Sequence, residues 1–129
     1  MISIGDNVTI SADVVFITHD NSCIKINPKK SNLFGRICIG DNCFIGQRST
    51  ILYGVTLANN IIVASGSVVT KSFDTERVVI GGNPAKIITT WEDYEVKNAA
   101  YMMTRAEFAD AMLSHDESRL VVKSPYRPK

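Results

Sequence analysis

Aliphatic residues return at every sixth position across the middle of the chain. The series runs through Ile39, Ile45, Ile51, Leu57, Val63 and Val69, and the same spacing occurs near the start at Ile4, Ile10 and Phe16. A helix repeats apolar residues every three to four positions and a strand every two, so neither explains this period. Six-residue periodicity predicts a parallel β-helix, in which each hexapeptide forms one short side of a coil and the coils stack.

Each position of the hexapeptide has its own steric requirement. If three hexapeptides complete one turn, the first residue points into a narrow interior where aliphatic side chains stack in columns. The second position must turn a tight corner, and it is glycine at 5, 40 and 46 and serine or alanine at 11, 58 and 64. The fifth position also points inward and carries smaller residues, among them Cys43, Ser49, Val55 and Ser67. We therefore predict a solenoid from residue 4 to about residue 74.

The repeat is interrupted once. The hexapeptide that begins at Phe16 is followed by a polar, proline-containing stretch at residues 22–32, which includes Lys29 and Lys30, and the pattern resumes at Leu33. We interpret this stretch as an excursion loop that leaves the solenoid at one corner. Insertions of this kind often build the binding face of a repeat protein.

Counting three hexapeptides per turn across the insertion predicts how the coils stack. Residues 16–21 would lie beneath 45–50, and these beneath 63–68. The count places Thr18, Gln47 and Ser65 in one surface column, and His19, Arg48 and Gly66 in its neighbour. Coils about 4.8 Å apart would then bring His19 within roughly 10 Å of the Ser65 level.

The chain changes character after the solenoid. An extended piece with a turn at Asn83-Pro84 closes a first part at residues 1–88, and residues 89–129 form a helical extension and tail. Thr90 with Asp93 favours a helix start, continuing to about Met103. Thr104 and Glu107 form a capping box for a second, shorter helix toward Ser114.

Composition excludes several classes of function. The chain has 129 residues, with 14 basic against 13 acidic side chains, so its net charge of +1 does not favour nucleic acid or lipid surfaces. Apolar stretches are too short for a membrane span, and Met1 leads directly into the repeat, so we expect a cytoplasmic protein. The three cysteines lack the spacing of a metal site and are expected to be reduced thiols.

Several motifs occur together in order. They are Ile17-Thr18-His19-Asp20, Ile39-Gly40-Asp41-Asn42, the run from Val63 to Lys71, and Gly82-Asn83-Pro84-Ala85-Lys86. This set resembles the left-handed β-helix, hexapeptide-repeat acyltransferases, most of all the branch of sugar and polysaccharide O-acetyltransferases. The resemblance covers about residues 2–88. It implies a homotrimer with acetyl-CoA as co-substrate in a cleft between two solenoids, and a sugar or glycan hydroxyl as the acetyl acceptor.

The resemblance also assigns residues. It places His19 in the catalytic position and implies cofactor contacts at Gln47, Ser65, Thr70, Lys71 and Lys86, with Gly66 in the same corner as Ser65. A basic residue often found just after the closing turn is here Thr89, which leaves the CoA phosphates one cation poorer.

The chemistry needs a base that removes the hydroxyl proton during attack on the thioester. A histidine with an unperturbed pKa of about 6.5 suits this task. Asp20 is the first candidate to orient the His19 ring, and Asp13 or a carboxylate of a neighbouring subunit are alternatives. Backbone N–H groups at Gly46 or Gly66 are candidates for stabilising the oxyanion.

Other functions remain possible on the same fold. N-acetylation of a nucleotide-linked amino sugar and a noncatalytic scaffold are the two alternatives, because a fold does not dictate a function. Cys23 as an acyl-accepting nucleophile is a further alternative for the chemistry. A zinc enzyme would need three histidine ligands, and the chain offers only His19 and His115, so no metal site is expected.

Overall fold

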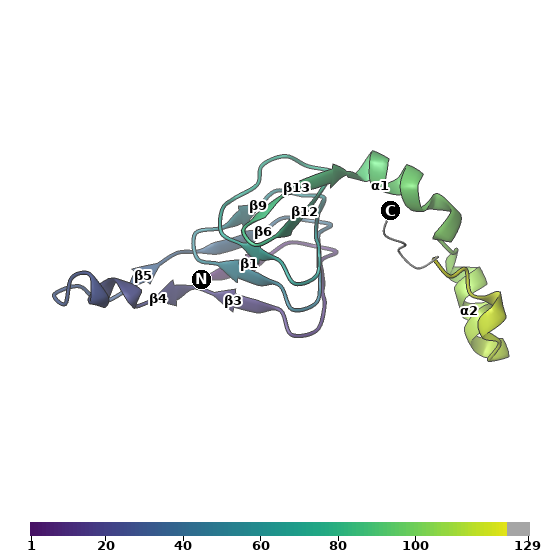
Figure 1. Ribbon diagram of the computed structural model, residues 1–129, viewed down its shortest axis with the longest axis horizontal. Coiled ribbons are helices and arrows are strands. Elements are labelled where there is room, and N and C mark those ends of the chain that lie inside the picture. The colour runs from purple at the N-terminus through teal and green to yellow at the C-terminus, as the bar shows by residue number, and fades with distance from the viewer. Residues whose placement is uncertain (124–129) are drawn as a thin grey trace, which may run out of the picture. The chain divides into compact units, whose positions relative to one another are not determined.

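The computed structural model describes residues 1–123, and its first part consists of stacked three-sided coils (Figure 1). Each side of the coils is a parallel sheet made by strands from successive coils. The first side contains β1 (Ile2–Ile4), β6 (Ile37–Ile39) and β9 (Thr56–Leu57); the second contains β2 (Thr9–Ile10), β7 (Phe44–Ile45), β10 (Ile61–Val63) and β12 (Val78–Gly82); the third contains β3 (Val15–Ile17), β8 (Thr50–Leu52) and β11 (Val68–Val69). The predicted parallel β-helix is confirmed.

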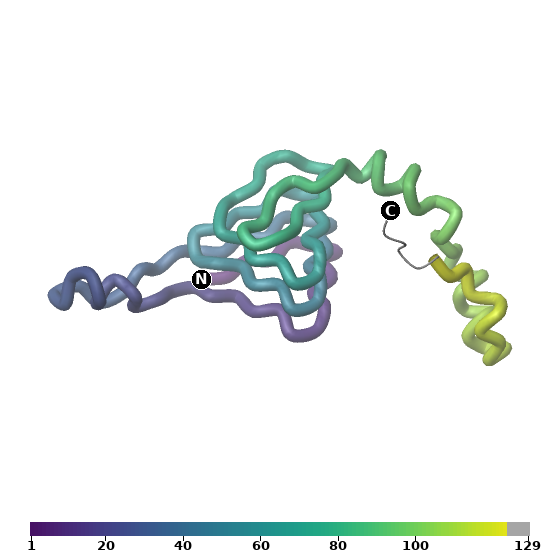
Figure 2. Tube along the Cα trace, in the orientation of Figure 1, coloured from purple at the N-terminus to yellow at the C-terminus, as the bar shows by residue number. Residues whose placement is uncertain are grey.

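Figure 2 shows the coils stacked on one another. Inside them, the residues of the six-residue series form columns. On the second side the pairing register places Ile10, Ile45 and Val63 at equivalent positions in successive coils. Ile45 and Val63 are completely buried, and each such burial contributes about 1.5–3 kcal/mol. Ile10 is 41% exposed because it belongs to the first coil, which is covered on one side only.

The smaller inward positions include buried hydroxyls that find partners. Ser49 Oγ donates to the carbonyl of Ala64 at 3.1 Å, and Ser67 Oγ donates to the same carbonyl at 2.5 Å. Buried polar groups are tolerated when they are hydrogen-bonded in this way. The fifth position therefore accepts serine because the buried hydroxyl is satisfied.

Glycine follows the inward residue where successive coils approach closely. A Cβ atom on Gly46 would lie 2.5 Å from the backbone nitrogen of Ser65 in the next coil, and one on Gly40 would lie 2.7 Å from that of Asn59. Both distances are far below van der Waals contact, so the expected collision of larger side chains at these corners is confirmed.

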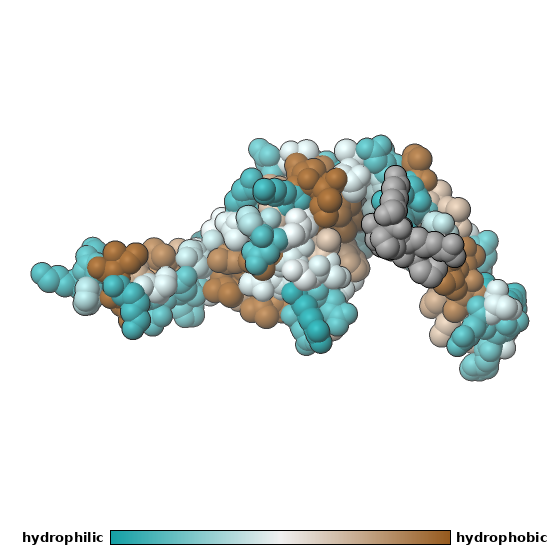
Figure 3. Space-filling view, viewed as in Figure 1, coloured by the Kyte–Doolittle hydropathy of each residue, from teal (hydrophilic) through white to brown (hydrophobic). Residues whose placement is uncertain are grey.

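The predicted excursion is an arm that projects from the corner between the third and first sides (Figure 1). It begins with β4 (His19–Asp20), continues through the 3-10 helix η1 (Ser22–Lys25) and returns along β5 (Leu33–Phe34), which pairs antiparallel with β4. Figure 3 shows apolar surface along the arm, where Ile26 and Phe34 are 90% and 63% exposed.

The stacking expected across the insertion is wrong for the first coil. Phe16 is in register with Ile51, so residues 16–21 do not lie beneath 45–50; that place belongs to the strand of Ile10, which pairs with Ile45. The arm leaves and rejoins within a single hexapeptide, and the sequence-based count treated the interrupted hexapeptide as two. Thr18 is therefore equivalent to Tyr53 rather than to Gln47, since Ile17 pairs with Leu52. The placement of 45–50 beneath 63–68 is correct.

The solenoid ends in a hairpin. Strand β13 (Ala85–Thr90) runs antiparallel to β12, with the turn at Asn83-Pro84. The contacts within the chain divide it into one unit at Met1–Trp91 and a second from Glu92 onward.

The second unit is helical. Its helices are α1 (Trp91–Asn98), which begins in the first unit's last residue, η2 (Ala99–Tyr101), α2 (Arg105–Ser114) and η3 (Glu117–Arg119). The helix α1 ends at Asn98, before the expected end at about Met103. The capping box of Thr104 and Glu107 begins α2 as predicted. Within residues 1–123, no helix is both long and apolar enough to cross a bilayer.

Candidate active site

His19 lies at the root of the arm with its side chain exposed. Its ring stacks on that of Phe34, the residue opposite it in the β4–β5 pair, with 5.6 Å between ring centroids and an interplanar angle of 24°. Nδ1 lies 3.5 Å from Thr18 Oγ1, and this is the ring's polar contact among residues 1–123. The other nitrogen, Nε2, is left available to exchange a proton with a bound molecule.

Asp20 does not contact the His19 ring through a hydrogen bond. Its Oδ1 accepts from the backbone nitrogen of Ser22 at 2.8 Å and from Ser22 Oγ at 2.6 Å, and its Oδ2 accepts from Tyr53 Oη at 3.0 Å. These bonds, first those from Ser22 and then that from Tyr53, hold the pKa of the Asp20 carboxyl below its ordinary value. Asp20 is thus an ionised acceptor that ties the arm to the second coil.

Gln47, Ser65 and Gly66 come together at a different corner, between the second and third sides. With Arg48 they line a hollow of about 350 Å³. The expected pairing of Gln47 with Ser65 in one column is confirmed, because Gly66 N–H donates to the Gln47 carbonyl at 2.8 Å. His19 is not in the neighbouring column: Arg48 N–H bonds the carbonyl of Ala12, so the first-coil residues at this corner precede Val15.

Gly66 keeps this hollow open. Its φ is +73°, and a Cβ atom built on it would meet no atom within 4 Å. Asp13 and Arg48, at the equivalent positions of the coils beneath, adopt the same left-handed conformation with φ of 59° and 58°. The backbone conformation alone therefore does not require glycine here, and the missing side chain leaves room for a bound molecule.

The two amides considered for an oxyanion site are already used. Gly46 N–H donates to the carbonyl of Val63 at 2.8 Å, and Gly66 N–H donates to Gln47 as described. Both bonds belong to the ladder between coils, so neither amide is free for an oxyanion, and that expectation is wrong.

Lys71 and Lys86 line a third place, a hollow of about 420 Å³. Lys71 follows β11 at the corner above Tyr53, since Ile51 and Val69 are in register, and Thr70 precedes it with an exposed side chain. Lys86 comes from β13, where it is paired with Gly81. Asp74 also lines this hollow, so its charged side chains give it a net positive charge, which favours an anionic ligand.

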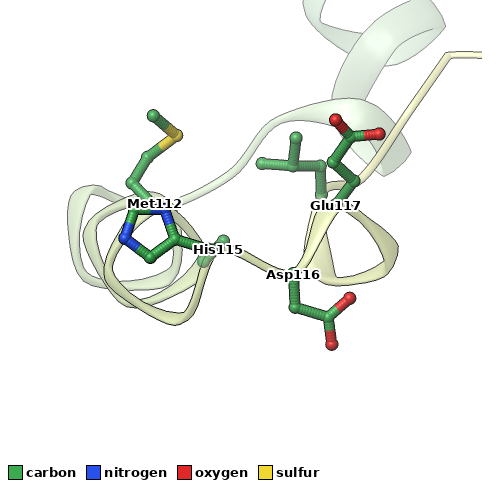
Figure 4. A pocket seen from close by; sticks show the side chains of 6 residues that line it. Met112, His115, Asp116 and Glu117 are labelled. Atoms are coloured by element: carbon green, nitrogen blue, oxygen red, sulfur yellow. The ribbon is translucent and has the colours of Figure 1, made fainter.

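A further hollow of about 340 Å³ lies in the helical unit (Figure 4). Met112 and His115 line it from the end of α2, and Asp116 and Glu117 from the following residues. Within residues 1–123, no group of three or more histidine, cysteine, aspartate or glutamate side chains could hold a metal ion. This hollow therefore lacks the ligand set of a metal centre.

Sequence reasoning missed Tyr53 and Phe34. Phe34 stacks on the ring of His19, the catalytic candidate. Tyr53, 33 positions beyond Asp20 in the sequence, hydrogen-bonds Asp20, which is the residue next to His19. A correct count through the insertion would have placed Tyr53 directly above Thr18, and this is the signal that could have identified it.

The stacked coils and the arm define a hexapeptide-repeat β-helix, with polar hollows at two of its corners. Residues 36–71 match the family model described as hexapeptide repeat of succinyl-transferase. Protein CapG of Staphylococcus aureus is 40% identical over 98% of this chain and 72% of its own length. The chain belongs to the hexapeptide-repeat acetyltransferase family.

Two solved structures show the same relationship. A maltose O-acetyltransferase from Clostridium difficile 630 is 32% identical, with a TM-score of 0.63 over 69% of this chain and 48% of its own. A hexapeptide-repeat acetyltransferase from Vibrio cholerae in complex with acetyl coenzyme A is 31% identical, with a TM-score of 0.63 over 69% and 49%. The chain thus spans about half the length of these two relatives.

Proposed function

We propose that the protein transfers an acetyl group from acetyl-CoA to a hydroxyl of a sugar or polysaccharide precursor, with His19 as general base. The observation that carries the proposal is the exposed His19 ring, whose Nε2 is free while its Nδ1 faces Thr18. The maltose O-acetyltransferase and the acetyl-CoA complex among the relatives support the acceptor class and the donor.

In this reaction Nε2 of His19 accepts the hydroxyl proton as the acceptor oxygen attacks the thioester carbon. The new carbon–oxygen bond forms, the carbon–sulfur bond breaks, and the proton leaves with the CoA thiol. Positioned proton transfer of this kind contributes about 10² to 10⁴ in rate. Thr18 Oγ1 lies 3.5 Å from Nδ1 and can accept from Nδ1–H in the tautomer in which Nε2 is the base.

The cofactor would be held by the two hollows. Lys71 and Lys86 supply positive charge for its phosphates, and Gln47 and Ser65 supply exposed polar side chains beside the space left open by Gly66. The carrier's charged end then serves for binding and its thioester end for chemistry.

A homotrimer completes the site. The strand between Arg48 and Tyr53 separates the two corners by five residues, roughly 17 Å at the rise of a β-strand. His19 and the hollow of Gln47 therefore lie a full side apart on one solenoid, and a neighbouring copy related by rotation would bring one corner against the other.

The test is acetyl-CoA turnover with a panel of neutral sugars, amino sugars and nucleotide-linked amino sugars, measured as free thiol. We expect hydroxyl acceptors to give turnover, and His19→Ala to lower kcat by about 10² or more. His115→Ala is the matched control, since this histidine belongs to the helical unit. Turnover with amino acceptors alone would favour N-acetylation, and an inactive wild type would favour the scaffold.

A further inference from the structure

The strand pair at the base of the arm that carries His19 is short. Strands β4 and β5 form only two residue pairs, His19 with Phe34 and Asp20 with Leu33. An isolated two-stranded ladder is marginally stable even when it is longer than this one. The position of His19 must therefore depend on contacts between the arm and the coils.

One such contact is a hydrogen bond across the corner. Tyr53 Oη donates to Asp20 Oδ2 at 3.0 Å, and both side chains are half-buried. The bond raises the pKa of Tyr53, while Asp20 is held ionised by Ser22 and by this bond, so the pair is a neutral donor on a charged acceptor. Charge-assisted bonds of this kind are about twice as strong as neutral ones.

The same bond sets the direction of His19. Successive side chains of a strand point to opposite faces, so Asp20 and His19 leave β4 on opposite sides. Holding Asp20 against Tyr53 of the second coil turns His19 and its stacking partner Phe34 to the other face, where His19 is exposed. A rotation of β4 about its own axis would turn the imidazole away from this face.

Close backbone packing beside Tyr53 supports the return of the arm. A Cβ atom on Gly35 would lie 2.3 Å from the nitrogen of Gly54, the residue that follows Tyr53. Gly35 N–H also donates to the Thr18 carbonyl at 3.0 Å. The two glycines bring the chains together, but they present no side chain that could define rotation of β4.

We propose that Tyr53 is a positioning residue for His19: its hydroxyl holds Asp20 on the second coil and thereby fixes the face on which the imidazole is presented. Asp20 then acts as an anchor for the arm and not as the partner of the His19 ring. The catalytic consequence rests on the proposed function, whereas the anchoring of the arm does not.

Tyr53→Phe tests the consequence for activity, because it removes the hydroxyl and keeps the ring. We expect kcat to fall about tenfold, as for the loss of one bond to a charged group, while KM for acetyl-CoA changes less than about threefold. Tyr94→Phe, which removes a hydroxyl in α1, is the matched control and should leave both constants unchanged. An unchanged kcat in Tyr53→Phe would overturn the proposal.

Two replacements of Asp20 separate anchoring from charge. Asparagine keeps an oxygen that can accept from Ser22 and an NH2 group that can donate to Tyr53 Oη, and alanine keeps neither, so Asp20→Asn should retain at least tenfold more activity than Asp20→Ala. If instead Asp20 supports a charged imidazole directly, both variants lose activity equally and Tyr53→Phe stays active. That pattern would overturn the assignment.

Amide hydrogen exchange tests the anchor without any activity. Tyr53→Phe should speed exchange in residues 19–35, most of all at Ser22 and Gly35, and leave residues 37–71 unchanged. If the wild type transfers no acetyl group, the proposed function fails while this measurement still decides the anchor. Equal exchange in the arm of both proteins would show that Tyr53 does not hold it.

Discussion

Lys71 and Lys86 line the same hollow, although one follows the strand β11 and the other lies in the closing hairpin. Lys71 Nζ also lies 5.5 Å from the centroid of the Phe73 ring, which keeps the ammonium group at the edge of the hollow. Two cations from separate elements would give the anionic end of the proposed cofactor a defined place.

Replacing either lysine should therefore weaken cofactor binding. Lys71→Gln and Lys86→Gln are each expected to raise KM for acetyl-CoA about tenfold, the effect of losing one bond to a charged group. The difference from wild type should shrink as salt screens the charges. Lys97→Gln, in α1, is the control, and an unchanged KM in both hollow variants would refute the cofactor assignment.

Gly46 and Gly66 should respond oppositely to alanine. At Gly46 the added Cβ would strike backbone at 2.5 Å, so Gly46→Ala should cost about 3 kcal/mol or more of unfolding free energy. At Gly66 the Cβ meets open space, so Gly66→Ala should cost about 1–2 kcal/mol for its left-handed backbone while raising KM for acetyl-CoA. Denaturant unfolding and kinetics measure the two effects; the reverse order of stability would contradict the geometry.

Alanine substitutions in the core columns should lower the stability most in the middle of the solenoid. Ile51 is completely buried between Phe16 and Val69, and Ile51→Ala should lower the free energy of unfolding by about 2–5 kcal/mol. Ile10→Ala, in the half-covered first coil, should cost about half as much. Urea titration of both variants checks this, and equal losses would mean that the first coil is covered in solution.

The depressed pKa of Asp20 predicts a pH dependence of stability. Because its folded pKa lies below its unfolded value, Asp20 stabilises the fold fully above the unfolded value of about 4. This contribution is lost as pH falls through the folded pKa. Thermal unfolding between pH 7 and pH 2 should therefore show a smaller acid-induced decrease in Tm for Asp20→Asn than for wild type. Identical curves would show that Asp20 makes no net contribution.

The assembly is testable by mass. One chain has a mass of 14.2 kDa, and light scattering should give about three times this value if the two corners meet between copies. Mixing His19→Ala subunits with subunits impaired at Gln47 and Ser65, on the other corner, should then restore part of the activity, since some interfaces combine an intact corner from each. A monomeric, active enzyme would exclude the shared site.

The six-residue period was enough to predict the coils, the inward columns and the glycine corners. These features depend on local steric rules that repeat in every hexapeptide, so Ile45, Ile51 and Gly46 could be assigned without knowing their partners. The capping box of Thr104 and Glu107 could also be predicted from the sequence, because its two hydrogen bonds join residues three positions apart.

The position of His19 relative to the rest of the site was decided only by the tertiary structure. A periodic pattern records the phase within a coil but not where an insertion rejoins it, and an arm that returns within one hexapeptide shifts the corner of Thr18 from Gln47 to Tyr53. The partners of Asp20 follow from that shift, since Tyr53 is brought to it by the stacking of coils and not by the chain between them. Sequence determined which side chains face inward; the pairing between coils determined which polar groups meet at each corner.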